Sequence, residues 1–233
     1  MIGLIPELKL QSHGTFEAFR NIATCSPSQN LFDDLVDEED WTVLQYADNL
    51  SSGIDHSLPQ RQRFEQYAKI DDSMLCFDEQ FWRWGRFGRK NYGVWYGALE
   101  EETSVRETLY HRPEIDINDL NNAHSPIIQA RCMFKADLAA QHYADLRPYV
   151  ASFPSLVHPR DYSLCQNLGQ HAVEQGIDLY LTPSARWPGG TCTPVFSARS
   201  IVKDQSIRTY FFHFPLDQSE PFYSTMQQNG PIN

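Results

Sequence analysis

Hydrophobic and polar residues change period along this 233-residue chain, and the periods predict where strands and helices lie. Residues 92–98 (YGVWYGA) are aromatic, β-branched and small, which predicts a buried strand. Residues 101–112 have helical composition, with Val105 and Leu109 four residues apart on one face. The acids at 100–102 fall at the start of this segment, where a helix dipole favours negative charge. A strand followed directly by an amphipathic helix is therefore expected here.

The rest of the chain adds more strands than helices. Gly176 is a suitable stop for a helix that begins near 161. Residues 137–149 are expected to form turns or helix, and the tail from 215 is not expected to have fixed structure. Further strands are predicted at 126–136, 177–182, 192–196 and 207–214. This order indicates the α+β class and no regular βαβ alternation.

Composition narrows the possible partners and the compartment. The formal net charge is −11, which argues against general nucleic-acid binding, because that relies on cations meeting phosphates. The five cysteines are scattered without a CxxC pair, so we expect free thiols, no metal site and no disulfide framework. The N-terminus is too polar for a signal peptide, and no apolar run approaches the ~18 residues of a membrane span. A cytoplasmic protein without membrane contact is expected.

The length predicts one domain over 1–233, with 1–70 as an accessory part of it. The acidic run at 33–40 is interpreted as a solvated helix start, with a basic partner as the alternative. Residues 49–60 are expected to be a loop and 61–70 a short helix, whose role the sequence does not reveal. Oligomeric state is likewise not predicted.

Basic residues gather just before the predicted strand, in an otherwise acidic chain. They are Arg83, Arg86, Arg89 and Lys90. This cluster, with the spacing R-F-x4-Y-G-V-x-Y and then E-T-x-Y-H-R, resembles the signature of the RES-domain family. A third block, TPSARWPGGTCTPVF around Ser184, resembles a later stretch of that family. The resemblance covers about 81–201 well and is looser over 15–41; the tyrosine that precedes the family's Pro-Ser dipeptide is replaced here by Thr182.

The resemblance implies a fold like that of ADP-ribosyltransferases, with two small β-sheets packed around an NAD cleft and flanking helices. It also implies an enzyme that consumes NAD by cleaving the nicotinamide–ribose bond. NAD is then a substrate, and no cofactor is expected. RES-domain proteins of this kind act as toxins of bacterial toxin–antitoxin pairs, so a cognate antitoxin protein of unknown identity is an implied partner.

Cleavage of that bond passes through an oxocarbenium-like ribosyl cation, which a nearby carboxylate can stabilise. Glu107 is the candidate carboxylate, and Tyr96 the aromatic face for the nicotinamide. Arg86 is the candidate fork for the phosphates, and Ser184 the hydroxyl that fixes the amide or ribose. The resemblance implies these roles. Arg20 on the opening strand and Arg83 in the basic cluster are further NAD-binding candidates.

Each candidate also has an ordinary structural interpretation. Glu107 would then be an exposed helix acid paired with His111 or Arg106, and Tyr96 would be plain core. The other candidates would be solvated or salt-bridged cations and, for Ser184, a turn residue after proline. Two further functions stay open: transfer of ADP-ribose to a protein, and a binding module without catalysis that keeps the same fold.

The acceptor of the ADP-ribosyl group is expected to be small, because the chain is acidic outside the basic cluster and has no obvious second domain for docking a protein. Water and inorganic phosphate are the simplest choices. Resemblance to RES-domain NAD phosphorylases favours phosphate, for which Arg83, Arg89 or Arg186 would be the spare cation.

Overall fold

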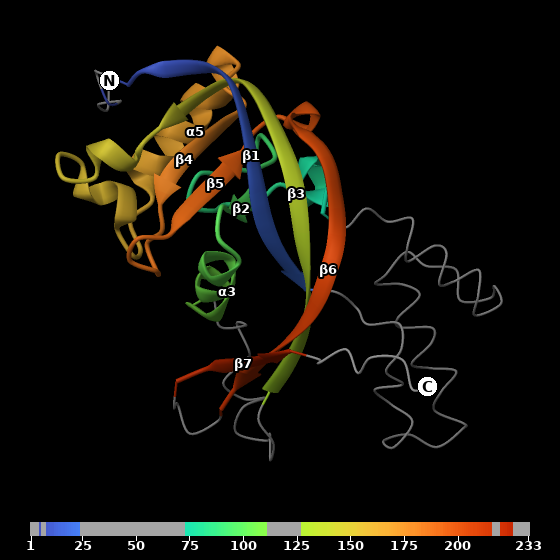
Figure 1. Ribbon diagram of the computed structural model, residues 1–233. Coiled ribbons are helices and arrows are strands. Elements are labelled where there is room, and N and C mark those ends of the chain that lie inside the picture. The colour runs from blue at the N-terminus through green and yellow to red at the C-terminus, as the bar shows by residue number, and fades with distance from the viewer. Residues whose placement is uncertain (1–4, 6–7, 24–72, 111–126, 216–219, 226–233) are drawn as a thin grey trace, which may run out of the picture. The chain divides into compact units, whose positions relative to one another are not determined.

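The computed structural model describes residues 5, 8–23, 73–110, 127–215 and 220–225 (Figure 1). They belong to one of two compact units, formed by Met1–Ala23 with Ser73–Asn233. The other unit, Thr24–Asp72, lies outside the described residues, as do the expected acidic helix start, the loop at 49–60 and the helix at 61–70. The expectation of a single domain therefore stays a prediction.

The described strands form one sheet in the order β1-β2-β5-β4-β3-β6-β7. An additional antiparallel pairing joins β1 to β3 along most of the length of β1. Because β1 and β3 also lie at the two ends of the run β1-β2-β5-β4-β3, these five strands close into a barrel. The strands are β1 (Leu10–Ala23), β2 (Trp95–Ala98), β3 (Ile127–Asp145), β4 (Leu179–Pro183), β5 (Thr191–Val195), β6 (Ile201–Phe214) and β7 (Phe222–Thr225).

This architecture corrects the expected fold class. An α+β, ADP-ribosyltransferase-like fold with two small sheets around a cleft is wrong for the described residues. They form a strand-rich closed barrel whose sheet continues through β6 and β7. Within these residues the α-helices are α3 (Glu101–Tyr110) and α5 (Ser163–Gln175). Short 3-10 turns complete the set: η1 (Leu75–Phe77), η2 (Glu79–Phe81), η3 (Arg147–Tyr149), η4 (Pro154–Val157) and η5 (Ala198–Ser200).

The length of β3 makes the closure possible. The turns or helix expected over 137–149 are wrong for 137–145, where β3 continues to Asp145. Its residues pair with β6 along the first part, with β1 along most of the strand and with β4 at the end. Irregularities at Met133/Phe134 and Asp137/Leu138 interrupt the register with β6, and such bulges increase strand bending. The single long strand β3 therefore pairs with three other strands.

One face of all five barrel strands contributes to a single buried cluster. Trp95 of β2 is fully buried there, with Ala18 of β1 and Leu138 of β3. β4 adds Leu179 and Leu181, so side chains two residues apart point into the barrel. Aromatic and aliphatic side chains fill the interior, as expected for a small barrel.

The outer face of the barrel carries the two helices, α5 near β4 and α3 near β1 (Figure 1). α5 ends at Gly176, as the sequence predicts, with a left-handed φ of 66°. Its Gly169 meets the chain at Phe87 so closely that a Cβ would collide with the Phe87 carbonyl oxygen. Side chains on the outer faces of the strands, such as Tyr180, pack against α5.

The tail contributes β7, contrary to the expectation of no fixed structure after 215. β7 pairs antiparallel with β6, and Tyr223 packs edge-on against Tyr210 at 5.5 Å between ring centroids. Its hydroxyl donates a hydrogen bond to Glu102 Oε2 at 2.9 Å, so β7 is connected to the first turn of α3. The aromatic contacts that stabilise β7 involve residues distant in sequence, which local composition does not reveal.

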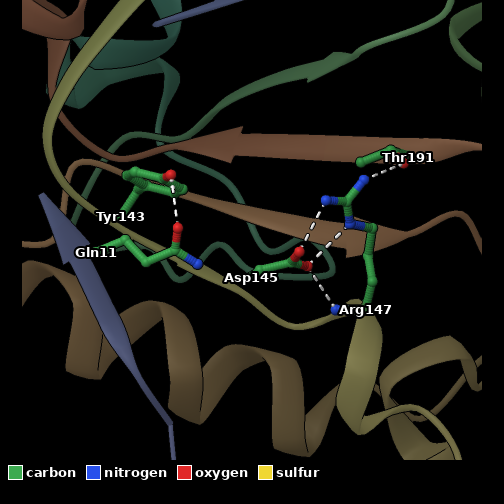
Figure 2. Close-up of polar contacts among 5 residues, drawn as sticks. All are labelled: Gln11, Tyr143, Asp145, Arg147 and Thr191. Atoms are coloured by element: carbon green, nitrogen blue, oxygen red, sulfur yellow. Dashed lines mark hydrogen bonds and ion pairs between the residues drawn. The ribbon is translucent and has the colours of Figure 1, made fainter. Parts of the chain in front are cut away.

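Polar contacts link the ends of the barrel strands (Figure 2). Arg147 forms an ion pair with Asp145, Nη2 to Oδ2 at 2.7 Å, and also donates to Thr191 Oγ1 at 3.4 Å. Nearby, Tyr143 donates to Gln11 Oε1 at 2.7 Å, which joins β3 to the start of β1. These contacts connect the end of β3 to β5 and to β1.

Candidate functional site

α3 is anchored on two sides. Val105 and Leu109 are buried with residues of β6 and with Met133, and Phe19 of β1 packs against the same cluster. The carboxylates of its first turn are also bound: Tyr210 donates to Glu101 Oε1 at 2.6 Å. A third contact precedes the helix, where Glu100 Oε2 accepts from Thr191 N at 2.9 Å. The helix that carries Glu107 is therefore fixed at its start and along its apolar face.

Glu107 is half-buried and points to the end of β4 and to β5. Its Oε1 accepts three hydrogen bonds: from Ser184 Oγ at 2.6 Å, from the backbone N–H of Ala185 at 3.2 Å and from Cys192 Sγ at 3.3 Å. In the part of the chain that the structure describes, no hydrogen bond reaches Oε2. One carboxylate oxygen is thus immobilised and the other is left for a different partner.

The bonding of Ser184 explains how the adjoining loop is ordered. Its hydroxyl donates to Glu107 and accepts from the backbone N–H groups of Arg186, at 3.1 Å, and Trp187, at 3.0 Å. Its own N–H donates to Gly190 O at 2.8 Å, which closes the loop at its base. Ser184 is therefore more than a turn residue, because it joins the loop to the carboxylate.

Two arginines stack on aromatic rings between α3 and the loop that follows Ser184. Arg106 of α3 lies 4.8 Å from the Trp187 ring centroid, and Arg186 of the loop lies over the Tyr110 ring of α3. Such contacts contribute about 0.5–1 kcal/mol each at exposed sites. Among the described residues, Arg106 forms its ion pair with Glu102, at 2.6 Å, and not with Glu107. The expected alternative of a Glu107–Arg106 pair is not what the structure shows, and His111 lies outside the described residues.

Tyr96 presents its ring to solvent while its hydroxyl is buried. The residue is 39% exposed, yet its hydroxyl accepts from Phe87 N at 2.9 Å. Burial of the hydroxyl raises the pKa of Tyr96, although the N–H groups of Phe87 and Gly88 oppose the shift. Tyr96 is therefore not a core residue. Its neutral hydroxyl is hydrogen-bonded to the backbone of Phe87, next to Arg86, and its ring is accessible.

Arg86 lies close to the end of β4. Its Nη2 donates to Pro183 O at 2.9 Å and to Leu156 O of η4. Its Nε is buried and has no hydrogen-bond partner in the described chain. Arg86 is consequently no member of a freely solvated cluster. Its Nη2 orders two carbonyl groups, and its Nε–H is buried and unpaired within the described residues.

Strand register brings these residues to one face. Ala98 pairs with Cys192 and Tyr96 with Pro194, so all four lie on the same side of β2 and β5. Trp95 and Gly97 alternate to the other side, which is the barrel interior. Since Cys192 contacts Glu107, the ring of Tyr96 and the carboxylate share the outer face of the sheet. The structure thus brings together Glu107, Ser184 and Cys192, and places Tyr96 and Arg86 on the same side.

Arg20 and Arg83, the two further NAD-binding candidates, differ in their exposure. Arg20 donates to Cys76 Sγ at 3.4 Å and lies 5.4 Å from the Trp95 ring centroid, on the barrel-interior side of β1. Burial lowers its pKa, a shift that the neighbouring Cys76 opposes. Arg83 is exposed. The structure does not bring Arg20 into contact with Glu107, and the NAD-binding roles of both arginines stay predictions.

Cys192 is the functional candidate that sequence reasoning missed. It was placed among scattered free thiols, and on the described residues it is a free thiol. Its contact with Glu107 depends on the pairing of β5 with both β2 and β4, at Ala98 and at Thr182. The only linear signal is its position eight residues after Ser184, in the block that carries the family resemblance.

No group of three or more His, Cys, Asp or Glu side chains suited to a metal ion occurs in the described ranges. Among the same residues, none of the helices combines the length and apolarity required to span a bilayer.

A model of the RES domain matches residues 74–217, and the chain belongs to this family. The match confirms the resemblance seen in the sequence.

Among solved structures, the chain is similar to one in the "Crystal structure of the M.tuberculosis MbcT-MbcA toxin-antitoxin complex". The sequences are 11% identical, the alignment covers 84% of this chain and 86% of that chain, and the TM-score is 0.42. No curated protein matches the sequence.

Proposed function

We propose that this protein is the toxin of a toxin–antitoxin pair and consumes NAD by cleaving its nicotinamide–ribose bond. Membership of the RES family supports the enzyme class. The observation that carries the proposal is the state of Glu107, with one oxygen fixed by three donors and the other free of hydrogen bonds from the described residues. A carboxylate so oriented can stabilise a ribosyl cation and bind its hydroxyls.

The neighbouring residues supply the other requirements. The accessible ring of Tyr96 offers a π face to the cationic nicotinamide, and its buried hydroxyl keeps the ring in place. The positive charge and planar guanidinium of Arg86 suit a phosphate oxygen of the dinucleotide. Ser184 donates its proton to Glu107 and accepts two N–H groups of the loop, so its proposed role is to fix the carboxylate.

We further propose a small acceptor, with inorganic phosphate preferred to water. A phosphate next to the ribosyl cation requires a cation. Arg83 is exposed and precedes Arg86 by three positions in the sequence, whereas Arg186 already donates to Pro159 O at 2.8 Å. Arg83 is therefore the better of these two candidates. In this reaction the nicotinamide–ribose bond breaks, nicotinamide leaves with the bonding electron pair, and a phosphate oxygen bonds to the ribose carbon.

The test is incubation of the purified protein with NAD in phosphate-free buffer and with millimolar phosphate, with products separated by chromatography. Phosphate is expected to accelerate NAD loss and to yield a phosphorylated ADP-ribose beside nicotinamide. Equal rates with only ADP-ribose as product identify a hydrolase. Label transferred from NAD to a lysate protein instead identifies a protein ADP-ribosyltransferase, and intact NAD in every arm favours a non-catalytic module.

An antitoxin that neutralises the protein is the proposed partner. Expression of the chain alone is expected to stop bacterial growth and lower cellular NAD, and expression of Glu107→Gln is expected to do neither. Growth arrest by both proteins at equal abundance would contradict the proposal that NAD cleavage causes toxicity.

A further inference from the structure

The hydrogen-bond donors to Glu107 Oε1 come from a loop and from a strand. Ser184 and Ala185 begin the loop that continues to Gly190, whereas Cys192 belongs to β5. Cys192 pairs with Ala98 on one side and with Thr182 on the other, so strands flank its backbone on both sides. It is the donor whose backbone is least free to move.

The thiol of Cys192 is unsuited to act as a nucleophile or as a metal ligand. Cys192 is buried, and burial together with the charge of Glu107 raises its pKa. It is consequently protonated at neutral pH, and a thiol that stays protonated is a poor nucleophile and a poor metal ligand. Its single S–H group points to the carboxylate at 3.3 Å, within the range of hydrogen bonds to sulfur.

The geometry points to Cys192 as a positioning residue for Glu107, a role that rests on the proposed function for its catalytic consequence. The S–H donor on β5 fixes the rotation of the carboxylate, so that Oε2 is directed away from the loop and towards the substrate. A donor on a strand that is paired on both sides keeps this orientation independently of the loop at 184–190. Removal of the donor should therefore affect turnover more than NAD binding.

Three variants separate this role from simple packing. Cys192→Ala removes the donor and leaves a smaller side chain, whereas Cys192→Ser keeps a donor. Cys132→Ala is the matched control, because Cys132 is a half-buried thiol of β3 that does not contact Glu107. Thermal unfolding of all three proteins shows whether each retains the fold.

Cys192→Ala is expected to lower kcat for NAD about tenfold, the change that follows from loss of one hydrogen bond to a charged group, with KM near the wild-type value. Cys192→Ser should recover most of the turnover, and Cys132→Ala should match wild type. Wild-type kcat in Cys192→Ala, or Cys192→Ser no better than Cys192→Ala, would overturn the assignment.

Infrared spectroscopy tests the hydrogen bond between Cys192 and Glu107 directly. It requires neither a measurement of enzyme activity nor the Cys192→Ala variant. The S–H stretching band of Cys192 is the one that Cys192→Ser removes. Glu107→Gln weakens the acceptor and Glu107→Ala removes it, so the band should move towards the frequency of a free thiol in both. An unmoved band in both variants overturns the inference. If wild type does not consume NAD, the proposed function fails, and this measurement still decides whether Cys192 bonds Glu107.

Discussion

The carboxylate of Glu107 shows which residue properties a sequence can reveal. Linear motifs pointed to Glu107 and Ser184, and the structure joins them by a 2.6 Å hydrogen bond although they are 77 positions apart. The motifs could not predict that Cys192 also bonds the carboxylate, because that contact depends on the register of three strands. They also could not show that Arg20 lies on the interior side with Trp95. The side of the sheet on which a side chain lies depends on strand pairing, and a short sequence motif carries no information about that pairing.

Arg86→Lys should raise the KM for NAD several-fold or more and lower stability. The guanidinium bonds two carbonyl oxygens with Nη2, and a lysine ammonium cannot reproduce its planar arrangement of donors. Steady-state kinetics and thermal unfolding measure both effects.

Arg89→Lys is the comparison for this prediction, because Arg89 donates to Asn167 Oδ1 on α5 and not to the end of β4. We expect a smaller change in KM there. Wild-type kinetics in Arg86→Lys together with a failing Arg89→Lys would show that the phosphate-binding role belongs to the other arginine.

Among the elements, α3 and α5 were predicted close to their observed bounds, since their signals are local. The acids at the start of α3 and Gly176 after α5 act within one turn of the helix that they flank. The continuation of β3 beyond the strand predicted at 126–136, and the whole of β7, were missed because both depend on distant partners. Residues 137–145 extend β3 by pairing with β1, and β7 is stabilised by Tyr210 and by Glu102.

Asp178, next to β4, connects that strand to β3 and sets a pH dependence. The residue is 1% exposed, and its Oδ2 accepts from the N–H groups of Gln141 at 2.7 Å and His142 at 3.0 Å. Burial alone would raise the pKa of Asp178, but these donors and Arg199 outweigh it, so the pKa is lowered. The carboxylate therefore stabilises the fold above its unfolded-state pKa of about 3.9, and this contribution is lost as pH falls through the lowered folded-state value.

Asp178→Asn is expected to reduce the free energy of unfolding at neutral pH by about 1–3 kcal/mol, because the amide lacks the negative charge that strengthens the hydrogen bonds from Gln141, His142 and Arg199. The variant should also lose less stability than wild type on acidification below about pH 4. Denaturant unfolding at several pH values measures both effects. Asp137→Asn, an exposed site on β3, is the control. Equal stability and an equal acid response in Asp178→Asn would refute the role of Asp178.

For the whole molecule, the sequence predicted a strand-rich order with two helices in the described part but not the closure of the barrel. The expected pair of small sheets came from the family resemblance, and the single sheet with its β1–β3 pairing replaces it. This pairing joins segments more than a hundred residues apart, such as Phe19 with Lys135. The barrel places its apolar face inside, which leaves the outer face of β2 and β5, between α3 and α5, to carry the proposed site.

The most direct test of the account compares NAD turnover by the wild-type protein and by Glu107→Gln, with nicotinamide release measured by chromatography. The glutamine keeps the size of the side chain and its contacts with the loop but removes the negative charge. We expect the wild-type protein to release nicotinamide, and Glu107→Gln to be folded by circular dichroism and slower by about 10²–10⁴-fold. Equal release by wild type and a correctly folded Glu107→Gln protein would contradict the central claim that this carboxylate carries the reaction.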